Sequence, residues 1–173
     1  MPVLIALLLG GILGSALKLE DRVENLGEHL RRKFKAKEGS FVEGFLDASL
    51  LFAIGPLAIL GSISDGMGNG IDQLTLKSVL DGFASMAFAS SLGWGVAASA
   101  IPVGIYQGAW TLIGLSLGNI MADFQVDAMT ITGGILLLAI GMRLLKIKNI
   151  PVGNLLPALF LAPVLALLFN AFA

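Results

Sequence analysis

The sequence contains the run LDGFASMAF at residues 80–88, in which one carboxylate, Asp81, lies among apolar and small residues. A second carboxylate in a similar setting, Asp47 of LDAS (residues 46–49), occurs 34 positions earlier. An ionisable group at bilayer depth costs about 2.5–3.5 kcal/mol on insertion scales, so a membrane protein that keeps two of them usually uses them. The two carboxylates therefore indicate a membrane protein that handles a cation or a proton.

The composition around these runs is that of an integral membrane protein. The chain of 173 residues is 56% hydrophobic, has a mean hydropathy of +0.88, and is only 13% charged, about half of the share usual in soluble domains. There are no cysteines, which excludes disulfides and thiolate metal sites, and the single His29 excludes a His-rich metal cluster. We expect no cofactor and no nucleic-acid partner, and the class of any bound metal stays open.

Six hydrophobic segments predict an all-α, polytopic bundle that forms one integral membrane domain over residues 1–173. About 20 helical residues cross the hydrocarbon core. Only Gly93 separates the third segment from the fourth, so the third either spans the bilayer or is re-entrant. The expected segments are roughly 2–17, 41–60, 75–92, 94–118, 127–145 and 151–172.

The basic residues predict the orientation of the chain. Loop 18–40 holds seven of the eleven Lys and Arg residues, and Arg143, Lys146 and Lys148 follow the fifth segment, whereas loops 61–74 and 119–126 hold none. The positive-inside rule therefore places loops 18–40 and 143–148 in the cytoplasm of a bacterial inner membrane. Lys77, at the outer end of the third segment, is the exception.

An amphipathic helix is predicted at residues 19–36, between the first two segments. Its apolar residues recur at helical spacing, and four acidic residues (Glu20, Asp21, Glu24 and Glu28) lie on the opposite face. Such a helix with a basic end is expected along the cytoplasmic interface, as an orientation anchor or as a regulatory or partner-binding helix.

Small residues recur four apart in several segments and predict close helix packing. The pairs are Gly10/Gly14, Gly104/Gly108 and Gly114/Gly118. Lipid supplies no hydrophobic drive for helix association, so such pairs let backbones approach closely. We expect them to form packing seams and to support a homo-oligomer. The sequence similarity between residues 45–48 and 79–82 is either an internal repeat or a chance match in apolar sequence.

The candidate pathway residues are Asp47, Asp81 and the polar groups near them. Each aspartate is six residues inside its segment, about 9 Å from the end, with Asp47 nearer the cytoplasm and Asp81 nearer the outside. Ser85 is one turn from Asp81 and shares its face. Alternatively, either aspartate caps a helix, or Asp81 pairs with Lys77, four residues earlier.

The fourth segment adds Pro102 and Gln107. Pro102 is expected to free a backbone carbonyl near mid-span, and Gln107 offers an amide at similar depth. Alternatively, Pro102 produces only a kink in the helix, and Gln107 forms a hydrogen bond to a neighbouring helix. In loop 61–74, Asp65 is expected to attract cations at an outer vestibule or to lie in a simple external loop. That loop fails the EF-hand pattern, because Met67 takes a position that needs an oxygen ligand.

Four stretches of the chain carry a family resemblance. They are LGSISDG (60–66), KSVLDGFASMAFAS (77–90), AIPVGIYQG (100–108) and GGILLLAIG (133–141). Together they resemble the YqgA-like bacterial membrane proteins, domain of unknown function family 554. The resemblance implies a polytopic inner-membrane protein described as a candidate sodium channel or pump, with no settled activity and no established site residues.

Members of that family usually begin with a further Gly-rich hydrophobic portion ahead of what is Met1 here. The resemblance therefore implies that this chain is a truncated or short form. If the missing portion pairs with the later segments, a second copy is expected to complete the fold.

The sequence thus predicts a non-enzymatic channel or transporter for sodium or protons. No hydrolase, phosphate-loop or zinc motif is present. The expected partners are the lipid bilayer, a small cation or small solute, and further copies of the chain. The expected site comprises Asp47, Asp81, Ser85, Gln107, Pro102 and Asp65. The alternative is a non-transporting membrane scaffold or sensor in which the aspartates form structural pairs.

Overall fold

The structure is a computed structural model that describes residues 1–35, 40–117 and 122–171. Within these residues all regular structure is helical, which confirms the predicted all-α class. Their contacts divide them into two compact units, residues 1–22 with 122–171 and residues 23–35 with 40–117. We describe each unit by itself, and a single domain over residues 1–173 stays a prediction.

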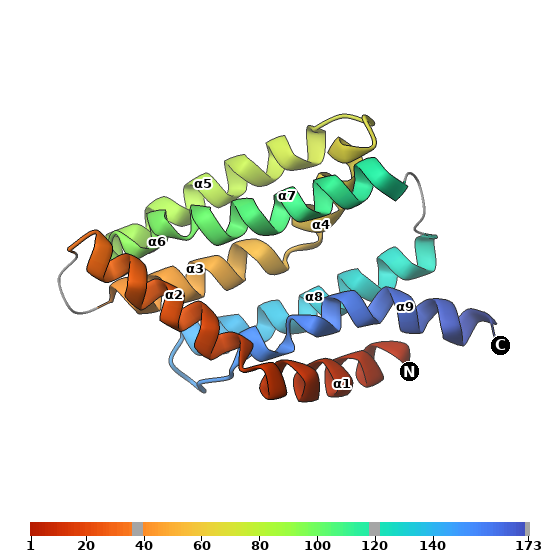
Figure 1. Cartoon of the computed structure of the whole chain (residues 1–173), viewed down its shortest axis with the longest axis horizontal. Coiled ribbons are helices and arrows are strands. Elements are labelled where there is room, and N and C mark those ends of the chain that lie inside the picture. The colour runs from red at the N-terminus through yellow and green to blue at the C-terminus, as the bar shows by residue number, and fades with distance from the viewer. Residues whose placement is uncertain (36–39, 118–121, 172–173) are drawn as a thin grey trace. The chain divides into compact units, whose positions relative to one another are not determined.

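The first unit consists of helices from both ends of the chain. In this unit α8 packs beside α9, and α1 packs along α9 (Figure 1). A cluster of small residues, Ala6, Ala128, Ala162 and Ala166, forms its core. Its elements are α1 (Pro2–Leu17), the beginning of α2 (Leu19–Lys33), α8 (Asp123–Leu144), the 3-10 turn η1 (Val152–Leu155) and α9 (Pro157–Ala171).

The predicted Gly10/Gly14 pair forms the seam between α1 and the segment η1–α9. A Cβ at Gly10 would lie 2.5 Å from the backbone N of Ala158, and one at Gly14 would lie 1.9 Å from the carbonyl O of Asn154. The contact thus moves back from Ala158 to Asn154 as α1 advances from Gly10 to Gly14, so α1 and the segment η1–α9 run antiparallel. Only glycine allows this approach, because a side chain at either position would overlap backbone atoms.

The second unit contains the rest of α2 and the middle of the chain. Here α4 packs along α7, with Gly66 against Thr111 and Gly114 against Ile63. α3 contacts α5, α6 and α7 (Figure 1). The elements after α2 are α3 (Phe41–Ile54), α4 (Pro56–Gly66), α5 (Asp72–Leu92), the short α6 (Gly95–Ala98) and α7 (Ala100–Leu117).

Two backbone predictions in this unit are corrected. The expected single helix 41–60 is broken at Gly55 into α3 and α4, which are bent by 60°. A proline at position 56 causes the break, since it disfavours helical backbone in the preceding residue and fits the first position of a new helix. Pro102 lies in the first turn of α7, where backbone N–H groups lack helical partners in any case. It therefore produces no mid-span break.

Among the described residues, three to five candidate spans are found. Gly95–Ser116, Asp123–Leu144 and Val152–Ala171 are each long and apolar enough to cross a membrane, and the bent pairs α1–α2 and α3–α4 qualify if each is one span. α5, which matches the predicted third segment, is one continuous helix of 21 residues but carries Asp72, Lys77 and Asp81. The sixth span and the interfacial position of residues 19–36 remain predictions, although α2 itself is helical over Leu19–Lys33.

Candidate functional site

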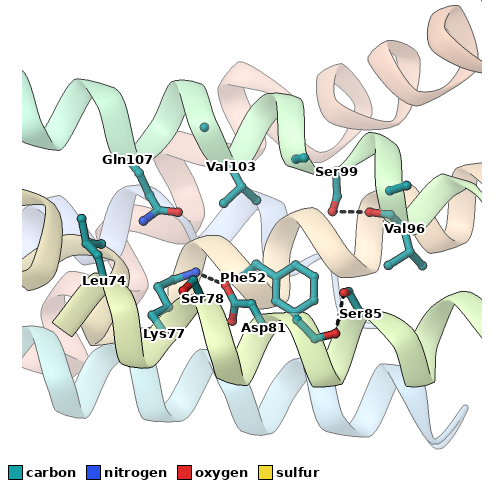
Figure 2. Close-up of a pocket in the computed structure, with 14 residues that line it drawn as sticks. Phe52, Leu74, Lys77, Ser78, Asp81, Ser85, Val96, Ser99, Val103 and Gln107 are labelled. Atoms are coloured by element: carbon teal, nitrogen blue, oxygen red, sulfur yellow. Dashed lines mark hydrogen bonds and ion pairs between the residues drawn. The ribbon is translucent and has the colours of Figure 1, made fainter. Parts of the chain in front are cut away.

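A pocket of about 380 Å³ in the second unit contains most of the polar residues that the sequence singled out. One wall is a stripe of α5, formed by Leu74, Lys77, Ser78, Asp81, Gly82 and Ser85. These positions recur at i, i+3, i+4 and i+7, so they share one face of the helix. The facing wall comes from α6 and α7 with Ser99 between them, and Phe52 of α3 closes the space (Figure 2).

An ion pair between Lys77 and Asp81 lies at the centre of the α5 wall. The two residues are one turn apart on the same helix, which brings their side chains together. Lys77 is only 6% exposed, and its Nζ lies 6.0 Å from the centroid of the Phe52 ring. Asp81 is the tenth of the 21 residues of α5. It is therefore about 14 Å from the start of the helix, deeper than the expected segment 75–92 implied.

The serine hydroxyls of the pocket already donate their protons to backbone carbonyls three residues earlier. Ser85 Oγ donates to the Gly82 carbonyl at 2.8 Å, Ser78 Oγ to the Thr75 carbonyl at 2.8 Å, and Ser99 Oγ to the Val96 carbonyl at 2.6 Å. A hydroxyl oxygen that donates its proton keeps two acceptor lone pairs. Towards the pocket, the three serines therefore offer acceptors, as a bound cation requires.

Gln107 of α7 lies on the wall opposite Lys77 and Asp81, with its amide towards the space between the helices (Figure 2). Its carbonyl adds a neutral acceptor, and its NH₂ group adds a donor. Of the predicted site residues, the pocket thus brings together Asp81, Ser85 and Gln107. Sequence reasoning missed Ser78 and Phe52; Ser78 was detectable from its spacing to Asp81 and Ser85, whereas Phe52 comes from another helix.

Three predicted site residues lie outside the pocket lining. Asp47 is in the middle of α3 and only 3% exposed, but it does not line the pocket. Pro102 is close in sequence to the lining residues Ser99 and Val103, but it is not one of them. Asp65 is in the last turn of α4, next to the connection that leads to α5. A role for these three in an ion path stays a prediction.

A second buried charge cluster in the first unit was not predicted. Glu20, which the sequence assigned to the polar face of residues 19–36, is 8% exposed and forms an ion pair with Arg143 of α8. Its carboxylate also accepts a 2.8 Å hydrogen bond from the Gly153 N–H, and its own N–H donates to Asn154 Oδ1 at 3.0 Å. The local pattern of α2 could not show this, because all the partners are more than 120 residues away.

The described residues hold no group of three or more His, Cys, Asp or Glu side chains that could bind a metal ion. The pocket instead presents one carboxylate, several neutral oxygens and one ammonium. In such a set one monovalent cation can exchange with the ammonium as the partner of the carboxylate. This exchange is the chemistry that the arrangement supports.

Comparison with known proteins gives membership of a family but no activity. The chain is 34% identical over 169 residues to the "Uncharacterized membrane protein YdfK" of Bacillus subtilis (strain 168), covering 98% of this chain and 71% of that protein. It is 38% identical over 179 residues to the "Uncharacterized protein YqgA" of Escherichia coli (strain K12), covering 96% and 73%. No solved structure matches the chain. The family described as "Protein of unknown function (DUF554)" matches residues 1–167, and the chain belongs to this family.

Proposed function

We propose that the chain is a membrane transport protein that binds a small monovalent cation, sodium or a proton, at the pocket around Asp81. One observation carries the proposal, the pair of buried Lys77 and half-buried Asp81 beside a wall of hydroxyl and amide acceptors. Ionisable residues inside membrane helices usually face a cavity and mark an ion path. The pocket is much larger than the about 30 Å³ that one water molecule takes up in the liquid, so it also has room for a small solute carried with the cation.

Binding and release at this site follow from the ion pair. A cation that enters the pocket competes with the Lys77 ammonium for the Asp81 carboxylate. Ser78, Ser85 and Gln107 replace part of its hydration shell, because they line the same space and their oxygens keep acceptor lone pairs. When the cation leaves, Lys77 neutralises the carboxylate again, which keeps the empty site from holding an unpaired buried charge.

Contacts inside each unit support the proposed alternation of spans. In the second unit, Ser40 Oγ before α3 donates to the Leu92 carbonyl at the end of α5 at 3.0 Å. In the first unit, the Glu20–Arg143 pair joins the end of α1 to the end of α8. Both contacts agree with six alternating spans in which loops 18–40 and 143–148 share the cytoplasmic side.

The same ion pair also favours the second candidate function. A non-transporting scaffold or sensor would use Lys77 and Asp81 as a structural pair, and it would assemble through its small residues. A Cβ at Gly104 or Gly108 would have no neighbouring atom within 4 Å, which leaves this face of α7 open to a second copy. On this reading, the pair contributes to stability and not to flux.

The experiment that separates the two functions compares sodium and proton flux into proteoliposomes for variants of the pair. Asp81→Asn tests the carboxylate, and the swap Lys77→Asp with Asp81→Lys keeps an ion pair but moves the carboxylate by one turn. Asp72→Asn, in the first turn of the same helix, is the matched control. We expect Asp81→Asn and the swap to lower flux at least tenfold, while Asp72→Asn keeps it.

Folding and assembly are followed in the same preparations by size-exclusion chromatography and circular dichroism. A swapped variant that folds but carries no flux supports an ion path through Asp81. A folded wild type without flux, whose assembly is lost in Asp81→Asn and restored in the swap, supports the scaffold and refutes transport at this site.

A further inference from the structure

A second hollow of the second unit, which we call the aromatic groove, has about 520 Å³ and is lined by apolar and aromatic side chains. It lies where the end of α2, the start of α3 and the connection from α5 to α7 meet. This volume falls within the about 300–1,000 Å³ of typical ligand pockets. Its lining residues are Phe34, Phe41, Trp94, Ala97, Ala98 and Ile101.

Two aromatic side chains at the groove are unusually exposed. Trp94 is 83% and Phe34 is 60% exposed. Trp94 follows Gly93, which ends α5 with a φ of 74°, a conformation that favours glycine. Tryptophan is enriched where membrane hydrocarbon meets headgroups, because its ring is apolar and its indole N–H seeks a polar partner.

Basic residues flank the lining residue Phe34 in the sequence. Phe34 continues the last turn of α2, since its N–H donates to the Leu30 carbonyl at 2.9 Å. The backbone of Phe34 is therefore fixed as a continuation of α2, one or two residues from the basic positions. Arg31 already pairs with Glu28 at 2.9 Å, whereas Arg32, Lys33 and Lys35 are exposed to solvent.

We propose that the aromatic groove binds an acyl chain of an anionic phospholipid, with the phosphate held by Arg32, Lys33, Lys35 and the Trp94 indole. The mostly apolar lining favours an acyl chain over a peptide, because a peptide would bury a row of backbone N–H and C=O groups against a wall whose side chains offer one donor, the Trp94 indole N–H. The cluster of positive charge selects an anionic headgroup over a zwitterionic one. The proposal does not depend on cation transport at the Lys77–Asp81 pocket.

The test uses tryptophan fluorescence quenched by lipids with brominated acyl chains. The chain has two tryptophans, and Trp110 is buried. The variant Trp110→Phe therefore leaves Trp94 as the reporter. If that variant does not fold, the difference in quenching between wild type and Trp94→Phe gives the same signal. Brominated phosphatidylglycerol is compared with brominated phosphatidylcholine of identical chains, each as a minor component of unbrominated phosphatidylcholine bilayers.

We expect phosphatidylglycerol to quench Trp94 at a mole fraction at least tenfold lower than phosphatidylcholine does. A basic residue near an anionic surface contributes about fivefold in affinity, so Arg32→Gln with Lys33→Gln should lower the affinity for phosphatidylglycerol by roughly 25-fold, enough to abolish a tenfold preference. Lys148→Gln, an exposed basic residue of the first unit, is the charge control and should keep the preference.

Three outcomes would overturn the proposal. Equal quenching by the two lipids in wild type would show that Trp94 contacts only bulk lipid. If Lys148→Gln lowered the preference for phosphatidylglycerol as much as the Arg32→Gln, Lys33→Gln variant does, the preference would be a general effect of surface charge. Removal of the preference by millimolar inorganic phosphate would show an anion site that holds no acyl chain.

Discussion

Glu20 at the start of α2 forms an ion pair with Arg143 of α8, 123 residues further along the chain, and the same carboxylate accepts a hydrogen bond from the Gly153 N–H. One side chain thus links three segments of the first unit: the α1–α2 junction, the end of α8 and the turn η1. The junction itself needs Lys18 in a left-handed conformation, with a φ of 50°. The carboxylate therefore holds in place a sharp turn of the chain that local preferences disfavour.

Glu20→Ala is expected to destabilise the first unit by about 2–4 kcal/mol, because it removes a buried ion pair and a hydrogen bond together. Glu20→Gln should lie between wild type and alanine, since an amide oxygen can still accept from Gly153. The measurement is equilibrium unfolding in mixed detergent micelles, followed by circular dichroism. Asp21→Ala, at the exposed neighbouring position, is the control and should change the free energy of unfolding by less than about 0.5 kcal/mol.

Gly14→Ala is expected to cost about 1–3 kcal/mol, since its Cβ would lie 1.9 Å from the carbonyl O of Asn154 and force α1 away from η1. Gly134→Ala is the control, because nothing lies within 4 Å of a Cβ there and alanine favours a helix. The thermal midpoint in detergent should fall for the first variant and stay level or rise for the second. Equal midpoints for the two variants would contradict the antiparallel seam.

Lys77→Met is expected to have opposite effects on stability and on cation binding. Removal of the ammonium leaves Asp81 as an unpaired, partly buried carboxylate, which should lower the free energy of unfolding by about 1–3 kcal/mol. If a cation competes with Lys77 for this carboxylate, the half-saturating sodium concentration for flux should fall at least threefold. An unchanged or raised value would show that the ammonium does not compete with the transported ion.

Asp47→Asn and Asp81→Asn are expected to differ, because only Asp81 lines the pocket. Asp81→Asn should remove saturable flux, whereas Asp47→Asn should leave the half-saturating cation concentration within about twofold of wild type. Initial flux rates over a range of sodium concentrations measure both values. A change in the Asp47 variant as large as that in the Asp81 variant would restore the sequence-based hypothesis of two carboxylates in one path.

The absence of native cysteines makes the orientation directly testable. Asn69→Cys, in the exposed connection between α4 and α5, should react with a membrane-impermeant maleimide added outside intact cells. Lys148→Cys, in the loop after α8, should react only after the membrane is permeabilised. The reverse pattern would invert the orientation, and reaction of both from outside would contradict the proposed alternation of spans.

The sequence by itself determined the features that depend on neighbours along one helix. The apolar runs located the helices, and α1 has the predicted bounds, because a continuous apolar run satisfies its backbone hydrogen bonds within one helix. The sequence also offered the Lys77–Asp81 pair as one alternative for the role of Asp81, since residues four apart on a helix are adjacent in space. The glycine spacing likewise indicated close packing at Gly10 and Gly14, though not its partner.

Only the tertiary structure decided which distant residues meet. It buried Glu20 against Arg143, placed Gln107 and Phe52 around Asp81, and left Asp47 outside that pocket. It also turned the expected helix 41–60 into two helices at Gly55. Apolar helix surfaces are chemically alike, so periodicity shows which face is packed but not which partner it meets. That choice depends on the fit of whole surfaces, and no local pattern contains it.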